Sequence, residues 1–136
     1  MKATFKKAER LSGKILIADL FKNGKSVKAF PFVLLYQAVE FEKTVPARLV
    51  ISIPKRKIKS AVKRNRIRRM VRESYRVQKH ALYDVLNSQH QQFALLIIFV
   101  GTESGLDSNL VQEKISRLLT RLSKEVTENY QAENTP

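Results

Sequence analysis

The sequence contains no cysteine and no tryptophan, and it has only four glycines and four prolines among its 136 residues. The lack of cysteine excludes disulfides and thiolate metal sites. No apolar run approaches the roughly 18 residues that a membrane-spanning helix needs. No apolar stretch with a small-residue cleavage site follows Lys2, so a signal peptide is not expected. These absences predict a cytoplasmic protein with no membrane partner.

Acidic residues are also scarce, since 12 of them accompany 26 lysines and arginines and leave a net charge of +14. So much charge exceeds what solubility requires and indicates a polyanionic partner. The 43% hydrophobic content is typical of a globular chain, and the length suits one compact domain. We expect that domain to cover residues 1–128, followed by a polar, disordered tail at 129–136.

The hydrophobic pattern predicts an α+β fold, a two-layer α-β sandwich in the order helix, strands, helix, strand, helix. A first helix is expected from a cap at Ser12 to Asn23. Strands are expected over 30–39, 48–53 and 93–100, with a weaker signal at 26–28, and further helices over 60–86 and 109–128. The hairpin-like spacing of 30–39 and 48–53 predicts that these two strands are antiparallel neighbours.

The positive charge is concentrated between Lys55 and Lys79, where 12 basic residues accompany a single acid, Glu73. At about 100° per residue, one group of polar side chains falls within an arc of roughly 140°. This group consists of Arg64, Asn65, Arg68, Arg69, Arg72, Arg76 and Lys79. The opposite side, expected to pack on the sheet, carries Ile67, Met70, Val71, Ser74, Val77 and Ala81.

Such a stripe is a poor solvated face, because arginines four residues apart on a helix repel one another. Guanidinium groups bind phosphate through paired hydrogen bonds and stack on bases, and the Asn65 amide offers a donor and an acceptor. A DNA-reading helix would need a helix-turn-helix partner, a zinc site or a zipper, none of which the sequence contains. RNA is therefore the expected polyanion, and DNA is not.

The remaining polar residues form no catalytic pattern. His80 and His90 are isolated and are expected at the surface, and the carboxylates are scattered. The polypeptide is thus expected to lack an active site of its own. Four lone aromatic side chains are expected to be core residues, namely Phe5, Phe30, Phe32 and Phe93.

Three segments together carry a family resemblance: KRKIKSAVKRNRIRR at 55–69, LFKNG at 20–24, and the FVLLY strand at 32–36. Over about residues 5 to 125 the chain resembles the bacterial ribonuclease P protein components. The resemblance implies an unusual left-handed βαβ crossover. It also implies the small subunit of an endoribonuclease that removes the 5′ leader from precursor tRNA. The partners would be a catalytic RNA subunit, with one protein per RNA, and the precursor tRNA; the RNA would perform the chemistry with Mg²⁺.

The resemblance also implies roles for individual residues. The RNA-binding set comprises Lys55, Arg56, Lys57 and Lys59 in the loop, and Lys63, Arg64, Asn65, Arg66, Arg68, Arg69, Arg72 and Arg76 in the helix. The leader-binding cleft comprises Phe21, Ile17 at a usually aromatic position, Val33, and Leu35 in place of a family tyrosine. The alternative is a non-enzymatic RNA-binding protein, such as a ribosomal protein or an RNA chaperone, which would not need this second, apolar surface.

Overall fold

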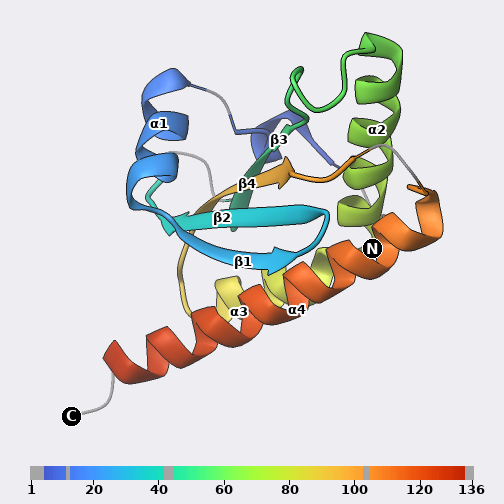
Figure 1. Ribbon diagram of the computed structural model, residues 1–136. Coiled ribbons are helices and arrows are strands. Elements are labelled where there is room, and N and C mark those ends of the chain that lie inside the picture. The colour runs from blue at the N-terminus through green and yellow to red at the C-terminus, as the bar shows by residue number, and fades with distance from the viewer. Residues whose placement is uncertain (1–4, 12, 42–44, 103–104, 134–136) are drawn as a thin grey trace.

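The computed structural model describes residues 5–11, 13–41, 45–102 and 105–133. Its elements are η1 (Lys7–Glu9), α1 (Lys14–Asn23), β1 (Lys25–Ala29), β2 (Phe32–Ala38), β3 (Ala47–Ser52), α2 (Ala61–Gln78), α3 (His80–Ser88), β4 (Phe93–Phe99) and α4 (Ser108–Glu133). The strands form one sheet in the order β1-β2-β4-β3 (Figure 1). The predicted α+β sandwich is confirmed, and the weak signal at 26–28 corresponds to β1.

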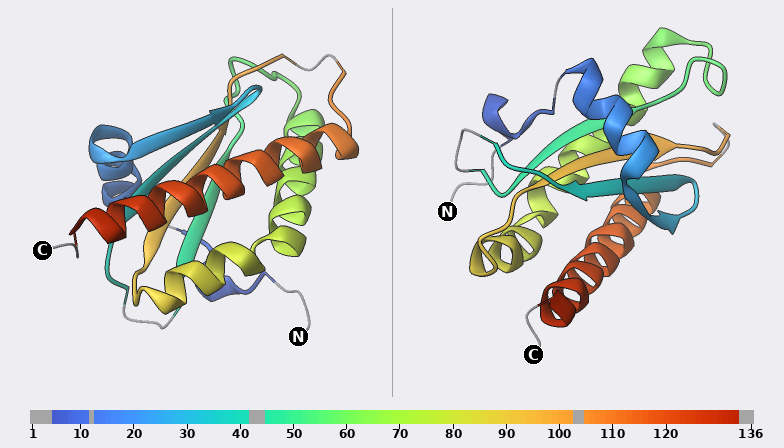
Figure 2. Two further views of the ribbon diagram at one scale, coloured as in Figure 1. Left: turned by 90° about the horizontal axis from the view of Figure 1, so that it is seen from below. Right: turned by 90° about the vertical axis from the view of Figure 1, so that its left-hand side faces the viewer.

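The two faces of the sheet are covered unequally. Helices α2, α3 and α4 lie on one face and build the main core, whereas α1 alone lies on the other (Figures 1 and 2). Alternation along β2 follows this division, because Phe32, Leu34 and Tyr36 are buried in the main core while Leu35 packs in the smaller cluster beneath α1. The α1 face therefore keeps partly exposed apolar side chains.

The predicted pairing of 30–39 with 48–53 is wrong. Strand β4 lies between β2 and β3, antiparallel to the first and parallel to the second. The reason is that β4 is buried on both faces, with Phe93, Leu95 and Ile97 on one and Ala94 and Leu96 on the other. Such a strand takes the centre of a sheet, where both of its edges are hydrogen-bonded.

The crossover from β3 to β4 runs through α2 and α3. In Figure 2 (left), the helices lie in front of the sheet, both strands run upward, and β4 lies to the left of β3. A right-handed connection would place the second strand on the right, so this crossover has the rare left hand that the resemblance implies.

The start of the basic helix is confirmed in detail, but its end is not. The Ser60 hydroxyl accepts a hydrogen bond of 3.3 Å from the Lys63 backbone N–H, as expected of a helix cap. The single helix predicted over 60–86 is two helices, because α2 ends at Gln78 and α3 begins at His80. Lys79 lies between them and turns its side chain inward.

The outer helices also differ from the predicted bounds. Helix α1 begins at Lys14 with Gly13 as its N-cap, and Ser12 lies outside the described residues. Helix α4 continues to Glu133, so residues 129–133 are helical where a polar tail was predicted. A hydrogen bond of 2.7 Å from the Tyr36 hydroxyl to Glu125 joins α4 to the sheet one turn before these residues. Among the described residues, no helix is long and apolar enough to cross a membrane.

Candidate RNA interface

The basic loop before α2 is a turn fixed from both sides. The N–H groups of Lys57 and Ile58 donate to the Pro54 carbonyl at 3.0 and 3.1 Å, and the Ile58 side chain is fully buried. The Arg64 guanidinium donates to the carbonyls of Ile58 and Lys59 at 2.9 and 2.8 Å. This arrangement leaves the remaining cations of the loop exposed, namely Lys55, Arg56, Lys57 and Lys59. Arg64 thus holds the loop in addition to carrying charge.

Helix α2 is rotated relative to the predicted wheel. Its buried side is formed by Ile67, Val71, Ser74 and Tyr75, whereas Val77 is 41% exposed. Tyr75, which was not predicted to be buried, is fully enclosed there, and its hydroxyl lies 2.9 Å from that of Tyr83 in α3. The solvent side consequently carries Lys63, Asn65, Arg66 and Arg69.

Two arginines of α2 have partners within the helix. The Arg68 guanidinium donates to the Asn65 side-chain oxygen at 2.8 Å, which orients it along the surface. Arg76 binds Glu73, with Nε donating to the carboxylate at 3.0 Å. This exposed pair lowers the pKa of Glu73, because the carboxylate accepts hydrogen bonds from the guanidinium. The single acid of the segment therefore offsets only Arg76.

Arg66, Arg69 and Arg72 are different, since none of them has a hydrogen bond or ion pair with another described residue. They line an open groove of about 740 Å³ along α2, together with Phe5, Met70, Glu73, Ser74, Arg76, Ser108 and Gln112. Phe5 is only partly buried and packs edge-on against Tyr75, with ring centroids 5.9 Å apart. An aromatic ring beside three unpaired guanidinium groups suits a polyanion that carries bases.

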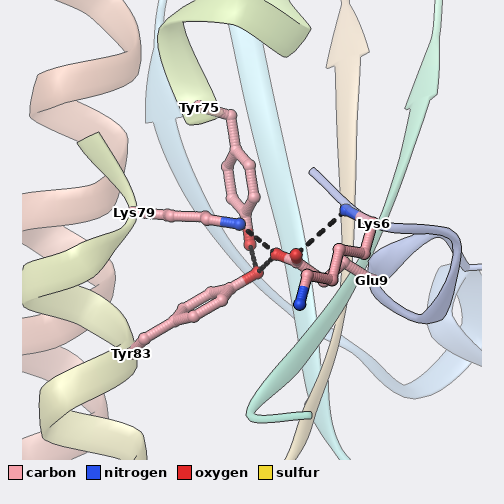
Figure 3. Close-up of polar contacts among 5 residues, drawn as sticks. All are labelled: Lys6, Glu9, Tyr75, Lys79 and Tyr83. Carbon is pink, nitrogen blue, oxygen red and sulfur yellow. Dashed lines mark hydrogen bonds and ion pairs between the residues drawn. The ribbon is translucent and has the colours of Figure 1, made fainter. Parts of the chain in front are cut away.

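Lys79, which the wheel placed on the arginine stripe, is buried. Its ammonium binds the Glu9 carboxylate, and the two side chains are only 5% and 7% exposed (Figure 3). The Tyr83 hydroxyl and the Lys6 backbone N–H donate to the same carboxylate at 2.7 and 3.1 Å. Burial acts to raise the pKa of Glu9, but these hydrogen bonds outweigh it and hold the pKa below its ordinary value. Lys79 therefore fixes η1 to the α2–α3 junction.

The four residues predicted to line a leader cleft lie on the α1 face of the sheet. Ile17 and Leu35 pack against the small cluster of Leu11, Leu20, Ala94 and Leu96. Phe21, in the last turns of α1, is 56% exposed, and Val33 is partly exposed on β2. All four thus lie on one side of the sheet, the side away from the main core.

The lone aromatics divide into two groups. Phe32 and Phe93 are buried, as expected, and Phe5 is partly so. Phe30 is 70% exposed, so its predicted place in the core is wrong. It lies in the turn between β1 and β2, where the strand alternation that buries Phe32 no longer applies. Among the described residues, no three His, Asp or Glu side chains converge in a group that could hold a metal ion.

The chain is similar, in sequence and in structure, to known ribonuclease P proteins. The family model described as Ribonuclease P matches residues 5–123. A ribonuclease P protein component of Porphyromonas gingivalis is 32% identical over 126 residues, covering 91% of each chain. One from Chlorobium phaeobacteroides is 33% identical over 126 residues, covering 85% of this chain and 86% of that relative. The solved RNase P protein from Thermotoga maritima matches with a TM-score of 0.61 and 27% identity, covering 83% of this chain and 96% of its own.

Proposed function

Because this chain belongs to the ribonuclease P protein family, we propose that it is the protein subunit of a ribonucleoprotein that removes the 5′ leader from precursor tRNA. An RNA subunit performs the cleavage in this assembly. The polypeptide binds that RNA and the substrate as a single RNA-binding domain, with one protein per RNA, in the cytoplasm.

The observation that carries the proposal is the set of unpaired guanidinium groups on α2. Arg66, Arg69 and Arg72 are held on a rigid helix, where they repel one another and find no acid among the described residues. Phosphate groups of RNA relieve that repulsion and accept paired hydrogen bonds. The exposed loop cations at 55–59 extend the same surface, and Asn65 and Arg68 lie within it as a hydrogen-bonded pair.

The leader is assigned to the α1 face. Phe21 offers an exposed ring, and Ile17, Val33 and Leu35 offer partly exposed apolar surface beside it. Single-stranded RNA binds such surfaces by stacking its bases, whereas paired RNA is recognised mainly through its phosphates and ribose groups. The unpaired leader of a precursor tRNA therefore fits this face, and the folded tRNA body fits the arginine surface.

Mg²⁺ is assigned to the RNA. The described residues contain no cluster of carboxylates or histidines that would hold it. The proposed role of this chain is to position the leader and to neutralise phosphates where the substrate meets the catalytic RNA. Without these cations, the phosphates of the two RNAs would repel each other.

The test is reconstitution. Purified protein, added to a bacterial ribonuclease P RNA at a Mg²⁺ concentration too low for the RNA alone, should restore cleavage of precursor tRNA. The protein without RNA should cleave nothing. Failure to restore cleavage, with RNA binding intact, would favour a structural RNA-binding protein or an RNA chaperone; cleavage by RNA-free protein would contradict the assignment of the chemistry to RNA.

A further inference from the structure

A second basic surface lies away from α2, where the β1–β2 hairpin meets α4. An open groove of about 560 Å³ there is lined by Lys28, Ala29, Phe30, Lys114, Ser116, Arg117, Thr120 and Arg121. Figure 2 (left) shows α4 crossing in front of the sheet, with the β1–β2 hairpin on one side of it and α3 on the other, while α2 passes behind its N-terminal part. This groove shares no lining residue with the groove along α2, and the sheet separates it from the leader face.

The groove combines four cations with one exposed ring. Phe30 is 70% exposed, the most exposed of the large aromatic side chains. Lys28, Arg117 and Arg121 are exposed, and Lys114 is half-buried. The only acid that pairs with this group in the described structure is Glu113, which binds Arg117 at 2.8 Å. A ring this exposed is not part of the core.

The groove is held in shape from both sides. The Arg121 guanidinium donates to the Lys28 carbonyl at 2.7 Å and joins α4 to the edge strand β1. Gly101 lies against the hairpin turn, since a Cβ built there would come within 2.5 Å of the Pro31 Cβ and 3.4 Å of the Phe30 Cζ. The turn that carries Phe30 is therefore packed against the chain that follows β4.

We propose that this groove binds single-stranded RNA, with a base stacked on Phe30 and phosphates bound by Lys28, Lys114, Arg117 and Arg121. Lys114 and Arg121 are about 10 Å apart along the helix axis, which exceeds the roughly 3.4 Å axial spacing of phosphates in one strand of a duplex. The cations can therefore contact different phosphates of one strand. The ring supplies the stacking platform that sequence-tolerant binding of unpaired nucleic acid uses.

Two other occupants fit less well. A second copy of this chain carries a net charge of +14 and would bring like charges together at the groove. An acidic protein would match the charge but would leave an exposed ring without a flat partner. The inference rests on the proposed function only for the class of ligand, because its residues are separate from those of α2 and α1.

The test uses the full-length protein carrying Phe21→Ala, which removes the exposed ring of the proposed leader face, and a fluorescent oligouridine of about 12 nucleotides, within the range of single-strand site sizes. Phe30→Ala should weaken binding by about 5- to 150-fold, the range for loss of one stacked base. The Lys114→Ala/Arg117→Ala variant should make the negative slope of log K against log salt shallower by about 1.4, at roughly 0.7 per contact. The matched control, Lys7→Ala/Lys14→Ala, removes two exposed charges on other elements and should change neither the affinity nor the slope. Thermal melting checks that each variant folds.

Unchanged affinity and slope in both groove variants would overturn the inference and leave the groove to an acidic protein. A loss on charge removal alone, with Phe30→Ala unaffected, would also overturn it, since base stacking would be absent. Repeating the assay with catalytic RNA and with precursor tRNA identifies which RNA supplies the strand. The Arg66→Ala/Arg69→Ala/Arg72→Ala variant separates the two proposals: if it binds RNA normally, the α2 assignment fails whatever the groove does.

Discussion

Arg69 and Lys79 belong to the same run of basic residues, but their side chains lie in opposite environments. Arg69 is exposed and bonds to no other described residue, whereas Lys79 is buried against Glu9. Periodicity placed both on one stripe. What separates them is an acid 70 residues upstream, which binds the second and not the first. A cation with an internal partner stabilises the fold, and one without a partner is available to RNA.

The largest effect should follow from breaking the buried pair. Lys79→Met leaves the Glu9 carboxylate buried without its cation, which should lower the free energy of unfolding by about 3 to 5 kcal/mol. Urea unfolding measures the loss. The double variant Glu9→Gln/Lys79→Met should recover much of it, because no unpaired charge remains. If the free energy of unfolding of Lys79→Met lay within about 0.5 kcal/mol of that of the parent, as for an ordinary surface substitution, Lys79 would have no structural role.

The leader face should show a smaller effect, confined to one substrate. Phe21→Ala should weaken binding of a precursor tRNA by about 1 to 3 kcal/mol, through loss of one stacked base. Binding of mature tRNA should not change. Filter binding of the two tRNAs to the holoenzyme, together with a melting curve of the variant, makes the comparison. Equal losses for both tRNAs would show that Phe21 acts through the fold and not through the leader.

Sulfate should distinguish the two kinds of cation in the free protein. An anion that binds the native arginine surface raises stability, by about 1.4 kcal/mol at tenfold its dissociation constant. The Arg66→Ala/Arg69→Ala/Arg72→Ala variant should lose most of this gain, and Lys79→Met should keep it. Melting temperatures in sulfate and in chloride at equal ionic strength provide the readout. The same gain in the triple variant would place the anion elsewhere.

The smallest effect should be a pH dependence from Glu9. Its pKa is lowered in the folded protein from an ordinary value of 4.5, so the folded state favours the charged carboxylate. The resulting stabilisation is fully present above pH 4.5 and is lost as the pH falls through the folded pKa. The difference in unfolding free energy between the parent and Glu9→Gln should therefore shrink in acid. A constant difference down to the acid transition would contradict the assigned pKa shift.

Local signals in the sequence predicted most of the elements. Ser60 caps α2 as expected, and the apolar runs at 32–38 and 93–99 are strands. These local signals could not predict which strands pair in the sheet. A run such as FALLIIF shows that a strand is buried on both faces, but not which strands flank it. The hand of the crossover came from the resemblance alone, since the general preference is for the opposite hand.

The site was predictable in kind but not in detail. The excess of cations over acids at 55–79 predicts an RNA-binding surface, yet only the structure separates Arg64, which braces the loop, from Arg66, which bonds to no described residue. Phe30 was assigned to the core because an aromatic side chain is usually buried. Phe30 is instead exposed, because it lies in a turn just after β1, where its side chain packs on neither face of the sheet.

The claim that unpaired arginines on α2 form the RNA surface is tested most directly by the salt dependence of binding to the catalytic RNA. Removal of Arg66, Arg69 and Arg72 should make the negative slope of log K against log salt shallower by about 2, at roughly 0.7 per phosphate contact. The matched variant Lys7→Ala/Lys14→Ala/Lys124→Ala, with the same charge change on exposed sites, should leave the slope within about 0.5 of the parent. Equal slopes for the parent and the α2 variant would contradict the account.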